Sequence, residues 1–264
     1  MKVLFITNHY LDSNGGGSFA SRAYANAFGE IAEMCVLLYP DRGKDISPFI
    51  HEKYILKGIS NSNSKIRKLF DIYRGRIHRF YKAIPAEVKE FQPDLVVFDN
   101  SRCSAGLIQH VNSLGIKVIV IHHNFEMEYH RGEPPNILWR IPFMYFMKKA
   151  EMNAVQKSDL NLTLTMQDAI LLRMNYNLNN QTKFELIGCF EYEKKKNLTF
   201  HKDITKNTKN ICIAITGTLS DLQTEDSLMP FLNSYYPLLL KIIPYSVLII
   251  AGKIAAYKVV YIWS

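Results

Sequence analysis

A group of polar side chains directly follows one apolar run near the middle of the chain. His122, His123, Asn124 and Glu126 come after the run Lys117–Ile121, whose composition is that of a buried strand. Open α/β sheets bind their ligands beyond the carboxyl ends of the strands, so we expect a binding site here. Neighbouring side chains of a strand point to opposite faces. We therefore assign the functional role to His123 and a structural role to His122.

The same residues include metal-ligand types, which opens a second interpretation. Imidazole and carboxylate groups bind zinc, but the spacing here lacks the HExxH pattern of a zinc helix. The four cysteines stand far apart and form no CxxC pair, which disfavours both a zinc site and a disulfide framework. We expect no bound metal or other cofactor, and we expect reduced, mostly buried thiols.

Polar residues also end the preceding strand-like run, Leu95–Asp99. Asp99, Asn100 and Ser101 follow its apolar part in sequence. They could line the same edge of the sheet as His123, because parallel strands end on the same side. The alternative is that they cap a helix that begins before Cys103.

A glycine-rich loop, NGGGS, joins the apolar run 2–7 to a helix-like pattern. Its glycines are Gly15, Gly16 and Gly17, and Ser18 follows as the expected helix cap. Backbone N–H groups at a helix N-terminus, with no side chains in the way, suit an anion such as phosphate. The loop is neither GxGxxG nor a P-loop, which disfavours an ordinary dinucleotide or ATP site. The alternative is a turn where strand and helix pack closely.

Strand-like and helix-like segments alternate along the first part of the chain. The strand-like segments are 2–7, 35–39, 95–99, 117–121 and 160–165, and helical patterns separate them at 18–31, 103–114 and 137–157. Such alternation predicts an α/β fold, a Rossmann-like parallel sheet with helices on both faces.

Composition changes near residue 190, which suggests two domains. The stretch 191–207 is rich in Lys and Asn and resembles a linker, so we expect a first domain over 1–190 and a second over 208–264. In the second, 211–216 and 246–251 are strand-like, 225–241 is helical, and Gly217 opens a turn. We expect these elements to form an incomplete second Rossmann-like unit, because 264 residues are fewer than two average domains require.

The chain is basic, with 32 Lys and Arg against 24 Asp and Glu and a pI near 9.2. This balance favours anionic partners. Seven cations and one acid fall in Ser64–Ile84, which has helical periodicity. This segment is either a helix with solvated cations or a surface for an anionic bilayer; no nucleic-acid-binding module accompanies it. Without a signal peptide or spanning segment, we expect a cytoplasmic protein, with peripheral contact to the inner face of the plasma membrane as the second possibility.

Seven segments in order resemble the retaining GT-B glycosyltransferases of family 4, especially those of bacterial polysaccharide assembly. They are KVLFITNHY, NGGGS, PDLVVFDNS, VIVIHHNFEMEY, KKAEMNAVQKSDLNLTLTMQD, ELIGCF and ITGTLSDLQTEDSLMPFLNSYYPLLLKIIPYSVLIIAGK. The resemblance covers about residues 1 to 253. No one segment is decisive, but the ordered set is fairly specific.

The resemblance implies an acceptor-binding domain that faces a nucleotide-sugar domain, with metal-independent catalysis in the cleft between them. The glycine loop would lie beside the donor phosphates, and His123 would approach the transferred sugar with support from Asn124 and Glu126. We add Ser18, Asn100 and Gly217 to the expected substrate-binding residues. The acceptor would be a saccharide or a lipid-linked sugar. Four further matching residues, Glu151, Asp159, Thr165 and Asp168, are expected to serve structure more than chemistry.

The second domain departs from this pattern. Such enzymes carry a pair of glutamates there, but no Asp or Glu follows Asp226. The segment Ile254–Ser264 does not continue the expected loop and strand pattern and looks like a truncation or frameshift. We therefore expect impaired or absent transferase activity. The alternative function is a non-catalytic acceptor-binding or membrane-surface module. A nucleotide-sugar epimerase is disfavoured by the glycine loop and the lack of a Tyr-x-x-x-Lys pair.

Overall fold

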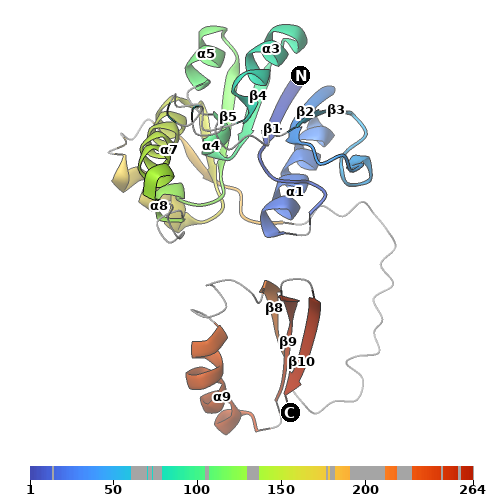
Figure 1. The fold of residues 1–264 in the computed structure, drawn as a ribbon, viewed down its shortest axis with the longest axis vertical. Coiled ribbons are helices and arrows are strands. Elements are labelled where there is room, and N and C mark those ends of the chain that lie inside the picture. The colour runs from blue at the N-terminus through green and yellow to red at the C-terminus, as the bar shows by residue number, and fades with distance from the viewer. Residues whose placement is uncertain are drawn as a thin grey trace. The chain divides into compact units, whose positions relative to one another are not determined.

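The fold consists of two compact units, Met1–Lys194 and Lys195–Ser264. In Figure 1 the first unit runs from blue to yellow and the second from orange to red. The computed structural model describes residues 1–13, 15–60, 70, 73, 79–104, 107–129, 137–176, 178, 182–190, 212–218, 228–244, 246–254 and 257–263. Most of the basic segment 64–84 lies outside these residues, so the helix expected there stays a prediction.

The first unit is built on a seven-stranded, wholly parallel sheet (Figure 1). Its strands are β1 (Lys2–Thr7), β2 (Met34–Pro40), β3 (Tyr54–Ile59), β4 (Leu95–Asp99), β5 (Lys117–His122), β6 (Leu160–Thr163) and β7 (Phe184–Leu186). Their order is β3-β2-β1-β4-β5-β6-β7. This confirms the Rossmann-like α/β fold. The chain reverses its direction of progress across the sheet between β1 and β4, where such folds bind ligands.

Helices connect the strands of this sheet. They are α1 (Gly16–Ile31), α3 (Ala83–Phe91), α4 (Ser101–Ser104), α5 (Ile108–Ser113), α6 (Glu126–Tyr129), α7 (Ile137–Lys157) and α8 (Met166–Asn175), with 3-10 turns η1 (Ser47–Phe49) and η2 (Arg79–Tyr81). In the described part of the chain, none of the helices combines the length and apolar character needed to cross a membrane.

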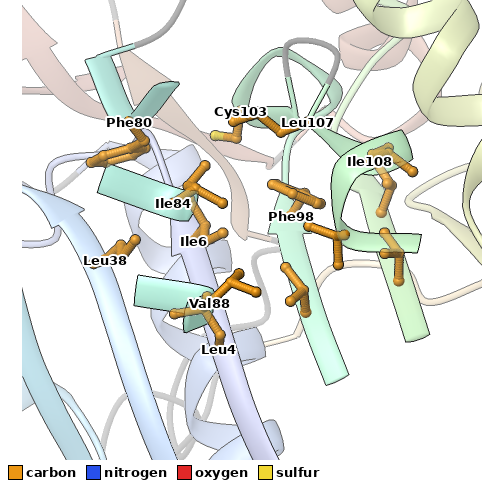
Figure 2. Close-up of a cluster of buried hydrophobic side chains, with 14 of the residues drawn as sticks. Leu4, Ile6, Leu38, Phe80, Ile84, Val88, Phe98, Cys103, Leu107 and Ile108 are labelled. Atoms are coloured by element: carbon orange, nitrogen blue, oxygen red, sulfur yellow. The ribbon is translucent and has the colours of Figure 1, made fainter. Parts of the chain in front are cut away.

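Each face of the sheet has its own hydrophobic core, because alternate strand residues point to opposite faces. One core joins Leu4, Ile6 and Phe98 to residues of η2, α3, α4, α5 and α7. Figure 2 shows Phe80, Ile84 and Val88 in this core. The other core joins Ala20, Tyr24 and Ala25 of α1 to strand residues that point to the opposite face. These strand residues are Val3, Phe5, Cys35, Leu37, Leu95, Val97 and Ile121. The sheet is thus buried on both sides, and only its edges and strand ends can present polar groups.

The first unit also contains elements that the sequence pattern did not predict. The edge strand β3 carries Lys57 and Gly58, which weaken the strand signal. Helix α3 includes Pro85 at its third position, where the first turn tolerates it. The expected cap Ser18 is wrong: α1 is capped at Gly15, without a side-chain cap.

The second unit contains a three-stranded sheet in the order β10-β9-β8. Its elements are β8 (Cys212–Thr218), the π-helical turn η6 (Phe231–Tyr235), α9 (Tyr236–Ile242), β9 (Val247–Ile254) and β10 (Tyr257–Trp263). Gly217 lies within β8, opposite Gly252, so the expected turn there is wrong. The segment after Ile254 also differs from expectation, because its aromatic and β-branched residues form β10, antiparallel to β9.

Candidate functional site

A buried ion pair joins the ends of β4 and β5. His123, directly after β5, places its Nε2 2.5 Å from Oδ1 of Asp99, the last residue of β4. Asp99 is fully buried and His123 is 8% exposed. The register of the parallel strands sets the two residues at the same edge. The predicted location of His123 at the strand end is therefore what the structure shows, and Asp99 is its partner.

The pair shifts the pKa of each group in the direction that favours its charged form. Burial alone would lower the pKa of His123, but the charge and hydrogen bond of Asp99, with the charge of Glu126, raise it. Burial alone would raise the pKa of Asp99, but the charge and hydrogen bond of His123, with smaller effects of His9 and Ser21, lower it. The two shifts thus favour an imidazolium beside a carboxylate at the carboxyl edge of the sheet.

The adjacent histidine, His122, has a different environment. Its Nε2 lies 2.9 Å from Oδ1 of Asn161 on β6. Burial lowers the pKa of His122 to about 4, against a smaller opposing effect of the Asn161 hydrogen bond. His122 is therefore neutral near neutral pH, buried, and bonded through Nε2 to the neighbouring strand β6.

Asn100 performs both tasks that the sequence left open. Its Oδ1 accepts a hydrogen bond from the Arg102 backbone N–H at 2.8 Å, which caps α4. Its Nδ2 donates to Oε1 of Glu126 at 2.6 Å. The backbone of Asn100 has a φ of 111°, a strained value for a residue with a side chain. That conformation lets one amide reach both α4 and α6.

The loop between β5 and α6 is held by carboxylates from other helices. The Phe125 N–H donates to Asp168 Oδ1 at 3.2 Å, and the Glu126 N–H donates to Glu151 Oε1 at 2.8 Å. These bonds occupy backbone donors at the start of α6. Glu126 is buried, whereas Asn124 is exposed. The structure thus brings Glu126 into the network of Asn100 and leaves Asn124 at the surface.

The glycine loop divides into an open part and a packed part. A Cβ on Gly16 would meet nothing within 4 Å, and one on Gly15 only the Ser13 hydroxyl, 3.8 Å away. A Cβ on Gly17 would lie 2.7 Å from Nδ1 of His9, which is too close for any side chain. Ser18 bonds to the Ser13 hydroxyl at 2.6 Å. Gly17 therefore makes room for His9, while Gly15 and Gly16 leave the N-terminus of α1 open.

His9 is the residue that sequence reasoning missed. It follows β1, and its ring lies 4.9 Å from that of His123, centroid to centroid. Burial lowers the pKa of His9, against the opposing charge of Asp99. Its position directly after β1, at the same edge as Asp99 and His123, was the available signal. Through His9, the glycine loop and His123 belong to one site.

Buried polar atoms without a hydrogen-bond partner gather at this edge. Among the described residues, all but one of these atoms belong to residues at the ends of β1, β4 and β5; they are Asn8 Oδ1, His9 Nε2, Asp99 Oδ2, Ser101 Oγ, Arg102 Nε and His122 Nδ1. Buried polar groups normally have partners, so such a concentration indicates a place built for polar ligand groups or water.

Other predicted features lie elsewhere. Gly217 belongs to the second unit and is described with it. Three further residues named from the sequence stabilise the fold: Asp159 accepts from the Val118 N–H, Thr165 caps α8 and Asp168 binds the Phe125 N–H. Within the described ranges, no three His, Cys, Asp or Glu side chains are grouped as a metal site would require.

Comparison with known proteins identifies the fold. No protein-family model matches the chain, and no curated protein matches it in sequence. The lipopolysaccharide outer core galactosyltransferase WaaB, in its apo form, aligns over 97% of this chain and 69% of its own, with a TM-score of 0.53 and 12% identity. UGT2 from Phytolacca americana, solved with UDP-2fluoro-glucose and pterostilbene, aligns over 94% and 71%, with a TM-score of 0.50 and 10% identity.

Sucrose-phosphate synthase from Thermosynechococcus elongatus gives a similar result. It aligns over 71% of this chain with a TM-score of 0.52 and 12% identity. The chain spans about half of that enzyme, 48% of its length. At these identities the likeness is one of fold: the chain has the α/β architecture of GT-B glycosyltransferases.

Proposed function

We propose that the chain is a glycosyltransferase that transfers a sugar from a nucleotide-sugar to a saccharide or lipid-linked acceptor. One observation carries this proposal: unpartnered buried polar atoms gather at the ends of β1, β4 and β5, the same strand ends that carry the Asp99–His123 pair, next to the strand-order reversal. Polar sugars need many hydrogen-bonding groups, and a departing diphosphate needs positive charge. The fold shared with glycosyltransferases supports the same conclusion.

The roles of the residues follow from their environments. The charge and hydrogen bond of Asp99 favour the protonated form of His123, and the protonated imidazole stabilises negative charge that develops as the diphosphate leaves. The open backbone of Gly15 and Gly16 offers N–H groups to phosphate at the start of α1. Asn100 and Glu126 offer an amide and a carboxylate to sugar hydroxyl groups. Asn124, exposed beside them, and Ser18 are assigned to the periphery of the substrate site.

The finer assignment comes from the sequence resemblance. We propose a retaining enzyme of the family 4 type that acts in cell-surface polysaccharide assembly without a metal, with Gly217 on the donor side. No Asp or Glu follows Asp226, so these 264 residues do not contain the glutamate pair of that family. We propose that these 264 residues by themselves transfer sugar slowly.

The decisive experiment measures sugar transfer by the purified chain. UDP-glucose, UDP-galactose, UDP-N-acetylglucosamine and GDP-mannose are supplied with saccharide and polyprenyl-phosphate-sugar acceptors, and nucleotide release and product mass are followed. We expect slow transfer with one donor and a loss of about 100-fold or more in His123→Ala. His110→Ala, which changes an exposed residue on α5, is the matched control. Equal activity in both variants would refute the role of His123, and no transfer from any donor would refute the function.

A membrane surface is the second proposed partner. The excess of cations in 64–84 favours contact with anionic lipid on the cytoplasmic face of the plasma membrane. Sedimentation with phosphatidylglycerol vesicles, but not with phosphatidylcholine vesicles, is expected at low salt and should weaken as salt rises. Absence of binding to both would exclude this partner.

A further inference from the structure

A buried carboxyl group lies one layer behind the site. Glu151, on the inner face of α7, is fully buried. Its Oε1 accepts a hydrogen bond from the Glu126 N–H at 2.8 Å, and its Oε2 accepts one from the Tyr176 hydroxyl at 2.6 Å. One side chain on α7 thus holds the start of α6 and the end of α8. Glu151 does not contact Asp99 or His123 directly through any of these bonds.

The contacts continue from Glu126 toward the proposed catalytic pair. Oε1 of Glu126 accepts a hydrogen bond from Asn100 Nδ2 at 2.6 Å. The backbone N–H of Asn100 donates to the carbonyl of Ile121 on β5 at 2.9 Å, two residues before His123. The charge of Glu126 contributes to the raised pKa of His123. The position of the Glu126 carboxylate therefore affects both Asn100 and His123.

The buried position of Glu151 changes the tendency of its carboxyl group to ionise. Burial raises the pKa of Glu151 to about 7; the Tyr176 hydroxyl and the Glu126 N–H oppose this, and the charge of Glu126 adds to it. Near neutral pH a large fraction of Glu151 therefore carries a proton. A protonated Glu151 still accepts the Glu126 N–H through its carbonyl oxygen.

We propose that Glu151 is a positioning residue, which fixes the Glu126 backbone so that the Glu126 carboxylate meets Asn100 and acts on His123. Its catalytic consequence rests on the proposed transferase function, whereas its effect on Glu126 and His123 does not. Without an acceptor on Glu151, the hydrogen bond from the buried Glu126 N–H is lost, and this part of the loop is held less tightly.

The first test is the titration of His123 followed by NMR in the free protein, with its signal assigned by its loss in His123→Gln. Asp99, His9, Glu126, Tyr24 and the adjacent His122 are titratable groups around it. Glu151→Asp keeps a carboxyl group but is too short to reach the Glu126 N–H, and Glu151→Leu removes the acceptor. We expect both to lower the pKa of His123 by roughly half a unit to one unit, because the Glu126 charge is displaced.

Two further variants separate positioning from packing. Glu151→Gln retains an oxygen for the Glu126 N–H and should leave the His123 titration unchanged. Tyr176→Phe removes a hydrogen bond to Glu151 but leaves the bond to Glu126, and it should also leave that titration unchanged. If Glu151→Leu does not fold, Glu151→Asp decides. An unchanged pKa of His123 in Glu151→Asp overturns the proposal, as does an equal fall in Tyr176→Phe.

Activity provides the second readout where the wild-type chain transfers sugar. Glu151→Asp should lower kcat by roughly 10-fold or more at an unchanged KM for the donor, and Glu151→Gln should restore most of it. An equal loss in Asp and Gln variants would overturn the positioning role. If the wild-type chain transfers nothing, the proposed function fails, and the NMR titration still tests Glu151.

Discussion

Two neighbouring histidines at the end of β5 have pKa values that are shifted in opposite directions. On the side of α1, His123 meets a buried carboxylate, and the pKa of the imidazole is raised. On the side of α7, His122 meets the neutral amide of Asn161, and its pKa falls to about 4. Both rings are buried, and the residues are neighbours in sequence. The partner therefore decides the charge, and the pleat of the strand decides the partner.

Buried atoms without a hydrogen-bond partner occur near both His123 and His122, so they do not distinguish the two regions. The ion pair between His123 and Asp99 does distinguish them. Asp99 and His123 form an ion pair near the strand-order reversal, beside unpartnered atoms of Asn8 and His9. Around His122 and Asn161 the contacts serve the fold: Nδ2 of Asn161 donates to the backbone carbonyls of Val155 and Lys183. The comparison shows that the Asp99–His123 ion pair lies on the α1 side of the edge, whereas the contacts of His122 are with a neutral amide.

The largest effect is expected from removing the charge on the His123 side. Asp99→Asn leaves a hydrogen-bond acceptor but no charge, so burial should lower the pKa of His123 below 6.5, as in His122. Transferase activity should fall by about 10²–10⁴-fold. Loss of one partner of a buried pair also costs up to about 3–5 kcal/mol of unfolding free energy. Histidine NMR, nucleotide-release kinetics and urea denaturation measure the three effects.

The wild-type pH dependence provides a check on the same pair. Because the pKa of His123 is raised in the folded state, its contribution to the stability of that state is fully present below the unfolded pKa of 6.5. This contribution is lost as the pH rises through the folded pKa. Because the pKa of Asp99 is lowered in the folded state, its contribution to the stability of that state is fully present above the unfolded pKa of 3.8. This contribution is lost as the pH falls through the folded pKa. Activity should decline above the His123 pKa. A rate that rises through this range in Asp99→Asn and wild type alike would contradict a role for the imidazolium.

Glu151, a buried carboxyl group that accepts hydrogen bonds from a hydroxyl and a backbone N–H, can be compared with Asp99, whose partner is His123. Its pKa rises from 4.5 to about 7, so the folded state holds the proton more tightly and stability falls as pH increases between these values. The shift corresponds to a loss on the order of 3 kcal/mol. Glu151→Gln removes this titration. Urea unfolding at several pH values should show the difference between wild type and variant changing by that amount, and a constant difference would refute it.

A charge placed on the His122 side should make the two regions more alike. In Asn161→Asp the new carboxylate would lie beside Nε2 of His122 and raise its pKa from about 4. The substitution also removes the donor to Val155 and Lys183, which should cost about 1–3 kcal/mol. Histidine NMR tests the first effect, with His123 as the internal control. An unchanged titration of His122 would show that its partner does not determine its charge.

The smallest effects concern the glycine loop beside His9. Gly17→Ala places a Cβ against the His9 ring and should cost about 1–3 kcal/mol. Gly16→Ala meets open space and should change stability by less than about 0.5 kcal/mol. Thermal unfolding of both variants measures the difference. Equal stabilities would show that Gly17 is not required for packing.

Particular residues show how far sequence reasoning reached. Strand periodicity placed His123, Asp99 and Asn100 at one edge, because parallel strands end together. It did not pair Asp99 with His123, since hydrogen bonding depends on register and side-chain rotamers. His9 was missed because the glycine loop that follows it dominated the interpretation of that segment. Strand β3 was missed because an edge strand tolerates Lys57 and Gly58.

By itself, the sequence determined the alternation of strands and helices, the parallel sheet and the polar ends of its central strands, because apolar periodicity and turn residues act locally. Only the tertiary structure decided which polar groups meet. Three contacts form between segments 24 to 39 residues apart in sequence: His123 with Asp99, His122 with Asn161, and the Glu126 N–H with Glu151. Desolvation and hydrogen bonding act over a few ångströms of space, and folding sets those distances.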